Sequence, residues 1–135
     1  MKSLDSKMKV STVLIVDDEP TFREMLSSFV SRNGYQTVCA ENSKEALAVL
    51  EKQSVDAVLL DIQLGTELGF NLLPVIREKH AVPVIMVTGL GYEEEIMQEA
   101  LKAGAAGYVS KVVPLNEVTV ALRRAMRRQT EPSAT

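Results

Sequence analysis

Acidic, hydroxyl and basic side chains follow four apolar segments of the sequence, each at the point where the segment ends. These segments end in Asp17-Asp18-Glu19, Asp61, Thr88-Gly89 and Ser110-Lys111. In an open parallel sheet the carboxyl ends of the strands share one edge, and ligands bind there. If the apolar segments are such strands, we expect these side chains to lie together at that edge.

Three carboxylates in a partly dry cleft repel one another unless a cation compensates their charge. Asp17, Asp18 and Asp61 therefore predict a divalent cation site. No His or Cys stands near the ends of these segments in the sequence. Oxygen ligands with retained waters favour Mg²⁺ over zinc, so Mg²⁺ is the expected cofactor.

A carboxylate beside such a cation can attack a phosphoryl group and form an acyl phosphate. Asp61 is the candidate nucleophile. Lys111 is placed to pair with phosphoryl oxygens, and the Thr88 hydroxyl is placed to donate to another. Gly89 leaves space for close backbone approach. Together these residues predict phosphoryl transfer in which the protein supplies position and charge.

Segments of strand length alternate with segments of helical period along the chain. The expected strands cover 12–16, 35–40, 55–60, 83–88 and 106–110, and the expected helices cover 20–33, 43–53, 67–79, 92–103 and 114–128. Strands this apolar are typical of a parallel sheet with helices on both faces. The sequence therefore predicts an α/β fold with a three-layer α/β/α sandwich.

Turn and cap residues support these boundaries. Gly34 and Gly104 follow the first and fourth expected helices, where glycine is free to adopt a positive φ. Asn42 or Ser43 is expected to cap the second helix, because both side chains can accept a bond from a free backbone N–H.

Length and composition predict one compact domain. The chain has 135 residues, 46% of them hydrophobic, and a net charge of −3. We expect a disordered lead-in over 1–9, the domain over 10–128 and a polar tail or linker over 129–135. No apolar run approaches the roughly 20 residues of a membrane span, and MKSLDSKMKV lacks a signal-peptide core. We therefore expect a cytoplasmic protein without membrane contact.

Some residues with reactive or charged side chains are assigned structural roles. Cys39 lies in an expected strand and is predicted to be a small core residue. His80 precedes the fourth strand and is expected at the opposite edge of the sheet. The last helix ends with Arg123, Arg124, Arg127 and Arg128. The helix dipole favours basic residues there, so direct nucleic-acid binding is not expected.

The motifs together resemble the receiver domain of bacterial two-component response regulators over residues 10–128. The matching motifs are LIVDDEP, LLDIQLGTELGF with Gly69 eight residues after Asp61, the VTG at 87–89 and the Lys of YVSK. The resemblance implies a five-stranded parallel sheet in the flavodoxin-like order 2-1-3-4-5 with five helices.

The resemblance also implies the roles of the site residues. Asp61 accepts a phosphoryl group from a sensor histidine kinase or phosphotransfer protein, so the domain is a switch and not an enzyme. Asp17, Asp18 and Asp61 hold Mg²⁺, with Asp18 the more direct ligand of the first two, and the backbone carbonyl of Gln63 completes the protein ligands. The phosphoryl group is contacted by Thr88, Gly89 and Lys111.

The resemblance implies how the signal leaves the site. In the family the Thr moves towards the phosphoryl group and an aromatic residue on the fifth strand turns inward; Thr88 and Tyr108 occupy these positions. The population then shifts towards another conformation of the surface formed by the fourth helix, fifth strand and fifth helix, about residues 92–122. It would regulate a partner protein or an output domain, and a homodimer is compatible with it.

Two loop positions depart from the family pattern. Val112 follows Lys111, where the family commonly has Pro after a cis peptide bond, and a cis bond before Val is far more costly. Gly65 stands where a Pro often follows the acceptor segment, so we expect a more mobile loop there. Neither change removes a charged or hydroxyl group that the chemistry needs.

Other functions fit parts of the sequence. A nucleotide or flavin binder on this fold needs glycines near the phosphate, whereas VDDEP places two carboxylates there. A phosphatase with an Asp nucleophile is expected to carry a second Asp two residues later, where Gln63 stands. The chain is also compatible with the receiver of a longer DNA-binding transcriptional regulator, and the sequence leaves this open.

Gln63 and Leu90 stand two residues after Asp61 and Thr88, at positions that influence phosphoryl lifetime in the family. A leucine cannot orient an attacking water through a hydrogen bond. We predict that self-dephosphorylation is not unusually fast and that Leu90→Glu shortens the lifetime of the phosphoryl group. Following the decay of the phosphorylated protein by mass spectrometry checks this, and equal lifetimes would contradict it.

Overall fold

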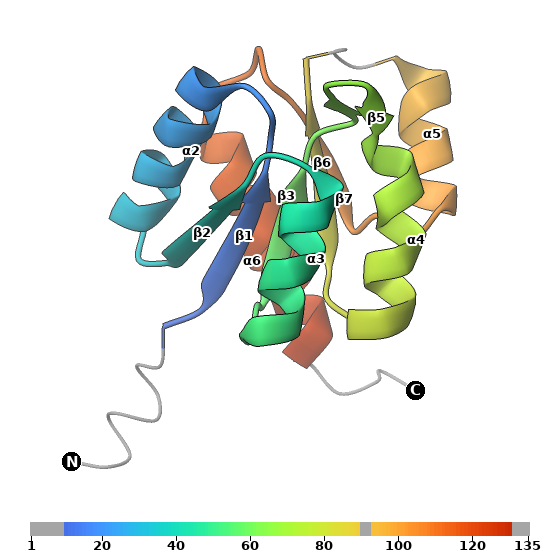
Figure 1. The fold of residues 1–135 in the computed structure, drawn as a ribbon. Coiled ribbons are helices and arrows are strands. Elements are labelled where there is room, and N and C mark those ends of the chain that lie inside the picture. Colours follow the sequence, from blue (N-terminus) through green and yellow to red (C-terminus); the bar gives the residue numbers. More distant parts are fainter. Residues whose placement is uncertain (1–9, 90–92, 131–135) are drawn as a thin grey trace, which may run out of the picture.

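A five-stranded parallel sheet forms the centre of the protein (Figure 1). The computed structural model describes residues 10–89 and 93–130, with side chains described to residue 127. The sheet strands are β1 (Thr12–Val16), β2 (Gln36–Ala40), β3 (Ala57–Leu60), β6 (Val84–Thr88) and β7 (Gly107–Ser110). Their order is β2-β1-β3-β6-β7, which is the predicted order 2-1-3-4-5.

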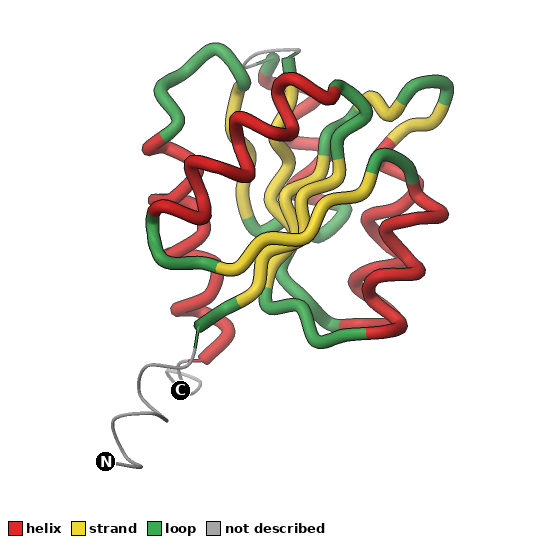
Figure 2. Tube along the Cα trace, turned by 60° about the vertical axis from the view of Figure 1, so that its left-hand side comes forward, coloured by secondary structure: helices red, strands yellow, loops and turns green. Residues whose placement is uncertain are grey.

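Helices cover both faces of this sheet, as Figures 1 and 2 show. Within the described residues the helices are α2 (Pro20–Arg32), α3 (Ser43–Lys52), α4 (Gly69–His80), α5 (Glu94–Lys102) and α6 (Asn116–Thr130). Helices α3, α4 and α5 pack on one face, whereas α2 and α6 pack on the other. The predicted three-layer α/β/α sandwich is therefore confirmed.

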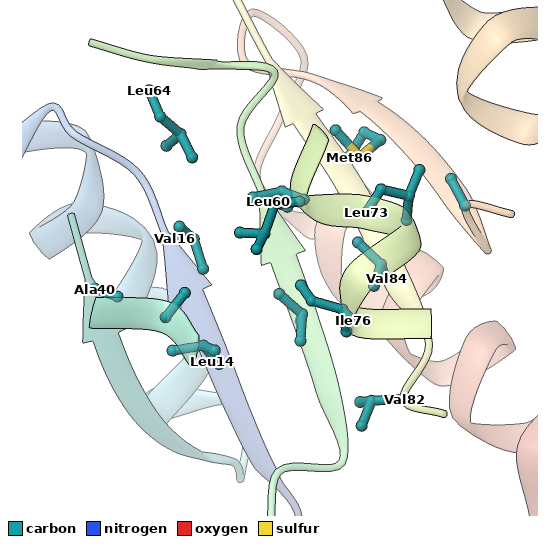
Figure 3. Close-up of a cluster of buried hydrophobic side chains, with 14 of the residues drawn as sticks. Leu14, Val16, Ala40, Leu60, Leu64, Leu73, Ile76, Val82, Val84 and Met86 are labelled. Carbon is teal, nitrogen blue, oxygen red and sulfur yellow. The ribbon is translucent and has the colours of Figure 1, made fainter. Parts of the chain in front are cut away.

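Side-chain alternation along the strands divides the core into two clusters. Leu60 of β3 faces α4, where it lies near Leu73 and Ile76 (Figure 3), while Leu59 faces the opposite cluster with α2 and α6. Both leucines are at most 1% exposed. Because successive residues of a strand point to opposite faces, a strand buried on both faces must be apolar throughout.

The predicted cap and turn residues agree with the structure. Asn42 caps α3, because its side chain accepts a hydrogen bond of 2.9 Å from the backbone N–H of Glu45. Gly34 and Gly104 have φ values of 98° and 106°. These glycines end α2 and α5 in a conformation that other residues rarely adopt.

A short hairpin between β3 and α4 was not predicted. It pairs β4 (Gln63–Leu64) with β5 (Glu67–Leu68) through a turn at Gly65 and Thr66. Gly65 has a φ of 64°, as a two-residue turn with glycine first requires. Helix α4 consequently begins at Gly69 and not at residue 67, because residues 67 and 68 are occupied in strand pairing.

The predicted core position of Cys39 is wrong, since its side chain is exposed. It lies on β2, the edge strand, where a residue has a neighbouring strand on one side only. His80 ends α4 at the amino-terminal edge of the sheet, as expected. The predicted lead-in (1–9), Leu90 and most of the predicted tail lie outside the described residues, as does the side chain of Arg128. No described helix is long and apolar enough to span a membrane.

Gly69 lies so close to the end of β3 that a Cβ there would overlap the backbone carbonyl of Asp61. Its N–H also donates a 2.6 Å hydrogen bond to the carbonyl of Ile62. We predict that Gly69→Ala lowers the free energy of unfolding by about 1–3 kcal/mol through overpacking, as measured by urea denaturation. Gly107→Ala is the matched control, because a Cβ there meets only side-chain atoms at 3.5 Å or more. Equal stability of the two variants would contradict the prediction.

Candidate functional site

Three carboxylates lie together at the carboxyl edge of the sheet. Asp17 and Asp18 directly follow β1, and Asp61 directly follows β3. These two strands are neighbours, with Val16 paired to Leu60. One carboxylate oxygen from each of the three Asp residues lies within 4.8 Å of the others. The parallel pairing therefore brings together charges that are 44 residues apart in the sequence, Asp17 to Asp61.

Lys111 supplies positive charge to this cluster. It follows β7, and its Nζ lies 2.9 Å from Asp17 Oδ2 and 2.9 Å from Asp61 Oδ2. Glu19 Oε1 is farther away, at 3.4 Å. The ammonium group also lies 4.5 Å from the centre of the Phe22 ring, which makes a cation–π contact. Lys111 thus bridges the two buried carboxylates.

Asp17 and Asp18 are adjacent in sequence but differ in their surroundings. Asp17 is 2% exposed, and its other carboxylate oxygen accepts a 2.9 Å hydrogen bond from the backbone N–H of Glu19. Asp18 is exposed and lines a hollow of about 430 Å³ together with Asp61, Gln63 and Lys111. The Asp18 carboxylate is therefore the one that faces this hollow with water access.

The ionisation of the site reflects its crowding. Burial raises the pKa of the Asp61 carboxyl above its ordinary value; the charge of Asp17 acts in the same direction, and Lys111 opposes it. Burial by itself lowers the pKa of Lys111, but its hydrogen bonds to Asp17 and Asp61 and their charges outweigh this and raise it. Charged Asp61 is thus under electrostatic strain, whereas Lys111 is held firmly in its protonated form.

Thr88 and Tyr108 lie on the two strands beside the carboxylates, and Gly89 directly follows the first of them. Thr88 ends β6 and is 1% exposed, and Gly89 lines the same hollow as Asp61. The carbonyl of Thr88 accepts a 2.8 Å hydrogen bond from the N–H of Lys111, which fixes the two segments side by side. Tyr108 is half-buried on β7 and packs against the cluster that contains Met86, its strand partner.

The sequence did not reveal several residues that support the site. Phe22 and Arg23 stand in the first turn of α2, where the Arg23 guanidinium donates a 2.7 Å hydrogen bond to the carbonyl of Asp17. Their signal was their position just after VDDEP, since a helix that starts there begins at the same edge. The loop after Lys111 lacks the cis bond common in the family, because no described peptide bond is cis.

The donor set of this edge fits Mg²⁺. The clustered oxygens come from three carboxylates, and within the described residues no His or Cys takes part in such a group. Hard divalent cations prefer oxygen ligands, and Mg²⁺ keeps several waters, for which the hollow beside Asp18 has room. The single charge of Lys111 does not balance three Asp carboxylates, so a further cation is electrostatically favoured.

Comparisons with known proteins establish the family. A family model of the response regulator receiver domain matches residues 13–123, so the chain belongs to this family of two-component systems. The chain is 29% identical over 119 residues to the heme response regulator HssR of Staphylococcus saprophyticus, covering 88% of this chain and 53% of that protein. It is 36% identical over 121 residues to the regulatory protein AtoC of Escherichia coli, covering 89% of this chain and 26% of that protein.

Solved structures agree with this assignment. A CheY-like receiver domain protein from Methanospirillum hungatei superimposes with a TM-score of 0.82 at 27% sequence identity, covering 90% of this chain and 97% of that chain. The resemblance drawn from the sequence motifs is therefore confirmed. The chain spans about half the length of HssR and about a quarter of AtoC.

The raised pKa of Asp61 predicts a pH-dependent gain in stability for Asp61→Asn. Below the ordinary value of 3.8 the wild-type group is protonated in the folded and unfolded states alike. As the pH rises above 3.8, the unfolded state loses its proton first, so the wild type loses stability through the window up to the raised pKa. Urea denaturation with a metal chelator should show the stability difference, variant minus wild type, growing across this window. A constant or shrinking difference would refute this reading of the site.

Proposed function

We propose that this receiver domain is a switch that accepts a phosphoryl group on Asp61 and then changes the surface it offers to a partner. The observation that carries the proposal is the buried Asp61 carboxylate, which shares one crowded edge with Asp17 and Asp18 and lies 2.9 Å from Lys111. The donor would be a sensor histidine kinase or a phosphotransfer protein.

In the proposed step, a carboxylate oxygen of Asp61 forms a bond to phosphorus while the bond from phosphorus to the donor breaks. The electron pair of that bond leaves with the donor group, an imidazole nitrogen when the donor is phosphohistidine. Lys111 already bridges Asp17 and Asp61, so its ammonium group needs only a short movement to pair with a phosphoryl oxygen. The Thr88 hydroxyl would donate a hydrogen bond to another phosphoryl oxygen, and Gly89, which has no side chain, would let the group approach the backbone.

Mg²⁺, when bound, would neutralise charge on the transferred group and on the carboxylates around it. We assign its protein ligands to Asp18, Asp17 and Asp61, together with the backbone carbonyl of Gln63. Between Asp17 and Asp18, Asp18 is the more direct ligand, because both carboxylate oxygens of Asp17 already have partners, Lys111 and the Glu19 N–H. Asp18 instead lines the water-accessible hollow.

The output of the switch would be the α5-β7-α6 surface, meaning the exposed side of those three elements. Thr88 ends β6, and Tyr108 lies on the adjoining β7, paired with Met86 two residues before Thr88. A movement of Thr88 towards a phosphoryl group would therefore alter the surroundings of Tyr108. A doubly charged phosphoryl group supplies the new hydrogen bonds that drive such a population shift. Its target would be a protein partner or an output domain, and relatives longer than this chain are compatible with the latter.

A phosphatase using Asp61 as its nucleophile is less well supported by the site. Gln63 stands where a second Asp would act as acid and base, and its backbone N–H donates a 3.3 Å hydrogen bond to Asp61 Oδ1. An amide side chain does not exchange protons at neutral pH. Phosphoryl acceptance without catalytic turnover is therefore the function we propose.

The decisive experiment tests acceptance of a phosphoryl group at Asp61. Incubation with acetyl phosphate and Mg²⁺ should raise the mass of the wild type by one phosphoryl unit, whereas Asp61→Asn should show no increase. Asp56→Asn is the matched control, because Asp56 lies before β3 at the opposite edge of the sheet and accepts a bond from the Thr12 N–H. A phosphorylated Asp61→Asn variant, or a wild type that takes up nothing, would overturn the proposal.

A further inference from the structure

Glu67 joins the hairpin of residues 63–68 to the start of helix α3. Its Oε1 accepts hydrogen bonds from the backbone N–H of Ser43, at 3.1 Å, and from the Ser43 hydroxyl. Ser43 is the first residue of α3, so this N–H is one of those that the helix itself cannot satisfy. A negative charge there is also favoured by the helix dipole. The hydrogen bonds from Ser43 lower the pKa of Glu67, which keeps its carboxylate charged.

The far end of this hairpin is exposed, and these hydrogen bonds join it to helix α3. Residues 65–68 are all exposed. A hollow of about 540 Å³ lies between this end and the start of α3, lined by Asn42, Lys44, Leu64 and Thr66 among others. By contrast, the base of the hairpin is fixed by the buried Leu64, which is 3% exposed. The Glu67–Ser43 hydrogen bonds therefore join the hairpin to α3 beside this hollow.

The same hairpin lies against the proposed metal site. A Cβ built on Gly65 would be 3.8 Å from Asp18 Oδ2, so the turn lies next to the exposed carboxylate. Gln63, at the start of the hairpin, lines one hollow with Asp18 and Asp61. Gly65 gives this turn more conformational freedom than other residues would allow. Any disorder of the turn would therefore disturb the residues that line the proposed metal site.

We propose that Glu67 is a positioning residue for the acceptor site: its hold on Ser43 fixes the 63–68 hairpin in the conformation that binds the divalent cation. This inference rests on the proposed function, since it assumes a cation at Asp17, Asp18 and Asp61. Without the tether, only part of the population has the hairpin in place, and the apparent affinity falls by that fraction. Glu67 itself does not touch the cation or the phosphoryl group.

The inference predicts weaker Mg²⁺ binding in Glu67→Gln, measured by isothermal titration calorimetry. Weakening of these charged hydrogen bonds should raise the Kd for Mg²⁺ about fivefold. Ser43→Ala removes one of the two bonds without changing any charge, and it should raise the Kd in the same direction by a smaller factor. In the metal-free proteins, NMR relaxation of the Gly65 and Thr66 amides should show greater mobility in both variants.

Glu45→Gln is the matched control for charge. Glu45 also lies in the first turn of α3, but its carboxylate accepts a bond from the N–H of Glu41 and not from the hairpin. Glu45→Gln should change the Kd for Mg²⁺ by less than about twofold, because salt screens the interaction of an exposed charge with the site. Equal effects of Glu45→Gln and Glu67→Gln, or unchanged amide mobility at Gly65, would overturn the inference.

The outcomes separate this inference from the proposed function. At saturating Mg²⁺, Glu67→Gln should still accept a phosphoryl group from acetyl phosphate, because Asp61 and Lys111 are unchanged. A wild type that takes up no phosphoryl group defeats the proposed function, whereas a wild type that is phosphorylated but shares its Kd with Glu67→Gln defeats the positioning role alone. The metal-free relaxation measurement tests the tether in either case.

Discussion

The mutual repulsion of carboxylates at one edge of the sheet is the constraint on which the site depends. The register of β1 and β3 makes Asp17 and Asp61 neighbours, and both are buried. Such a group is stable only beside positive charge. Lys111 reaches both carboxylates from the end of β7, the strand at the other edge of the sheet. The ion pairs therefore depend on the strand order, because only this order places Lys111 at the same end of the sheet within reach of both carboxylates.

The same repulsion links the resting protein to its proposed activity. Burial and the charge of Asp17 raise the pKa of Asp61, which means that the ionised carboxylate carries an unfavourable free energy in the folded state. The proposed transfer of a phosphoryl group would give Lys111 new oxygens to pair with. The crowded carboxylates thus lower stability in the resting state, while the proposed function needs the same groups close together and ionised. Folding and signalling place opposite demands on Asp61.

Much of the fold and the central site residues were predictable from the sequence, because both follow from local pattern. Apolar runs of strand length predicted the sheet, and Gly34, Asn42 and Gly104 predicted helix ends through their backbone preferences. The carboxyl-edge rule then placed the acidic and basic residues together. The exposure of Cys39 and the contact of Glu67 with Ser43 were not predictable in this way. They depend on which strand lies at the edge and on how a loop meets a helix 24 residues earlier.

The two departures from the family pattern, at Gly65 and Val112, show which parts of the site are fixed by the sheet and which depend on loop contacts. Residues placed by the sheet, such as Asp61 and Lys111, keep their relation even though the loops beside them differ in sequence. Gly65 lacks the stiffness of a proline, and the turn is instead held through the hydrogen bonds of Glu67 to Ser43, a residue outside the acceptor motif. Val112 replaces the other proline and is 81% exposed, directly beside Lys111. A loop beside residues that the sheet holds in place can therefore be fixed by contacts with the end of a helix distant in the sequence. The sequence of the loop alone does not determine its rigidity.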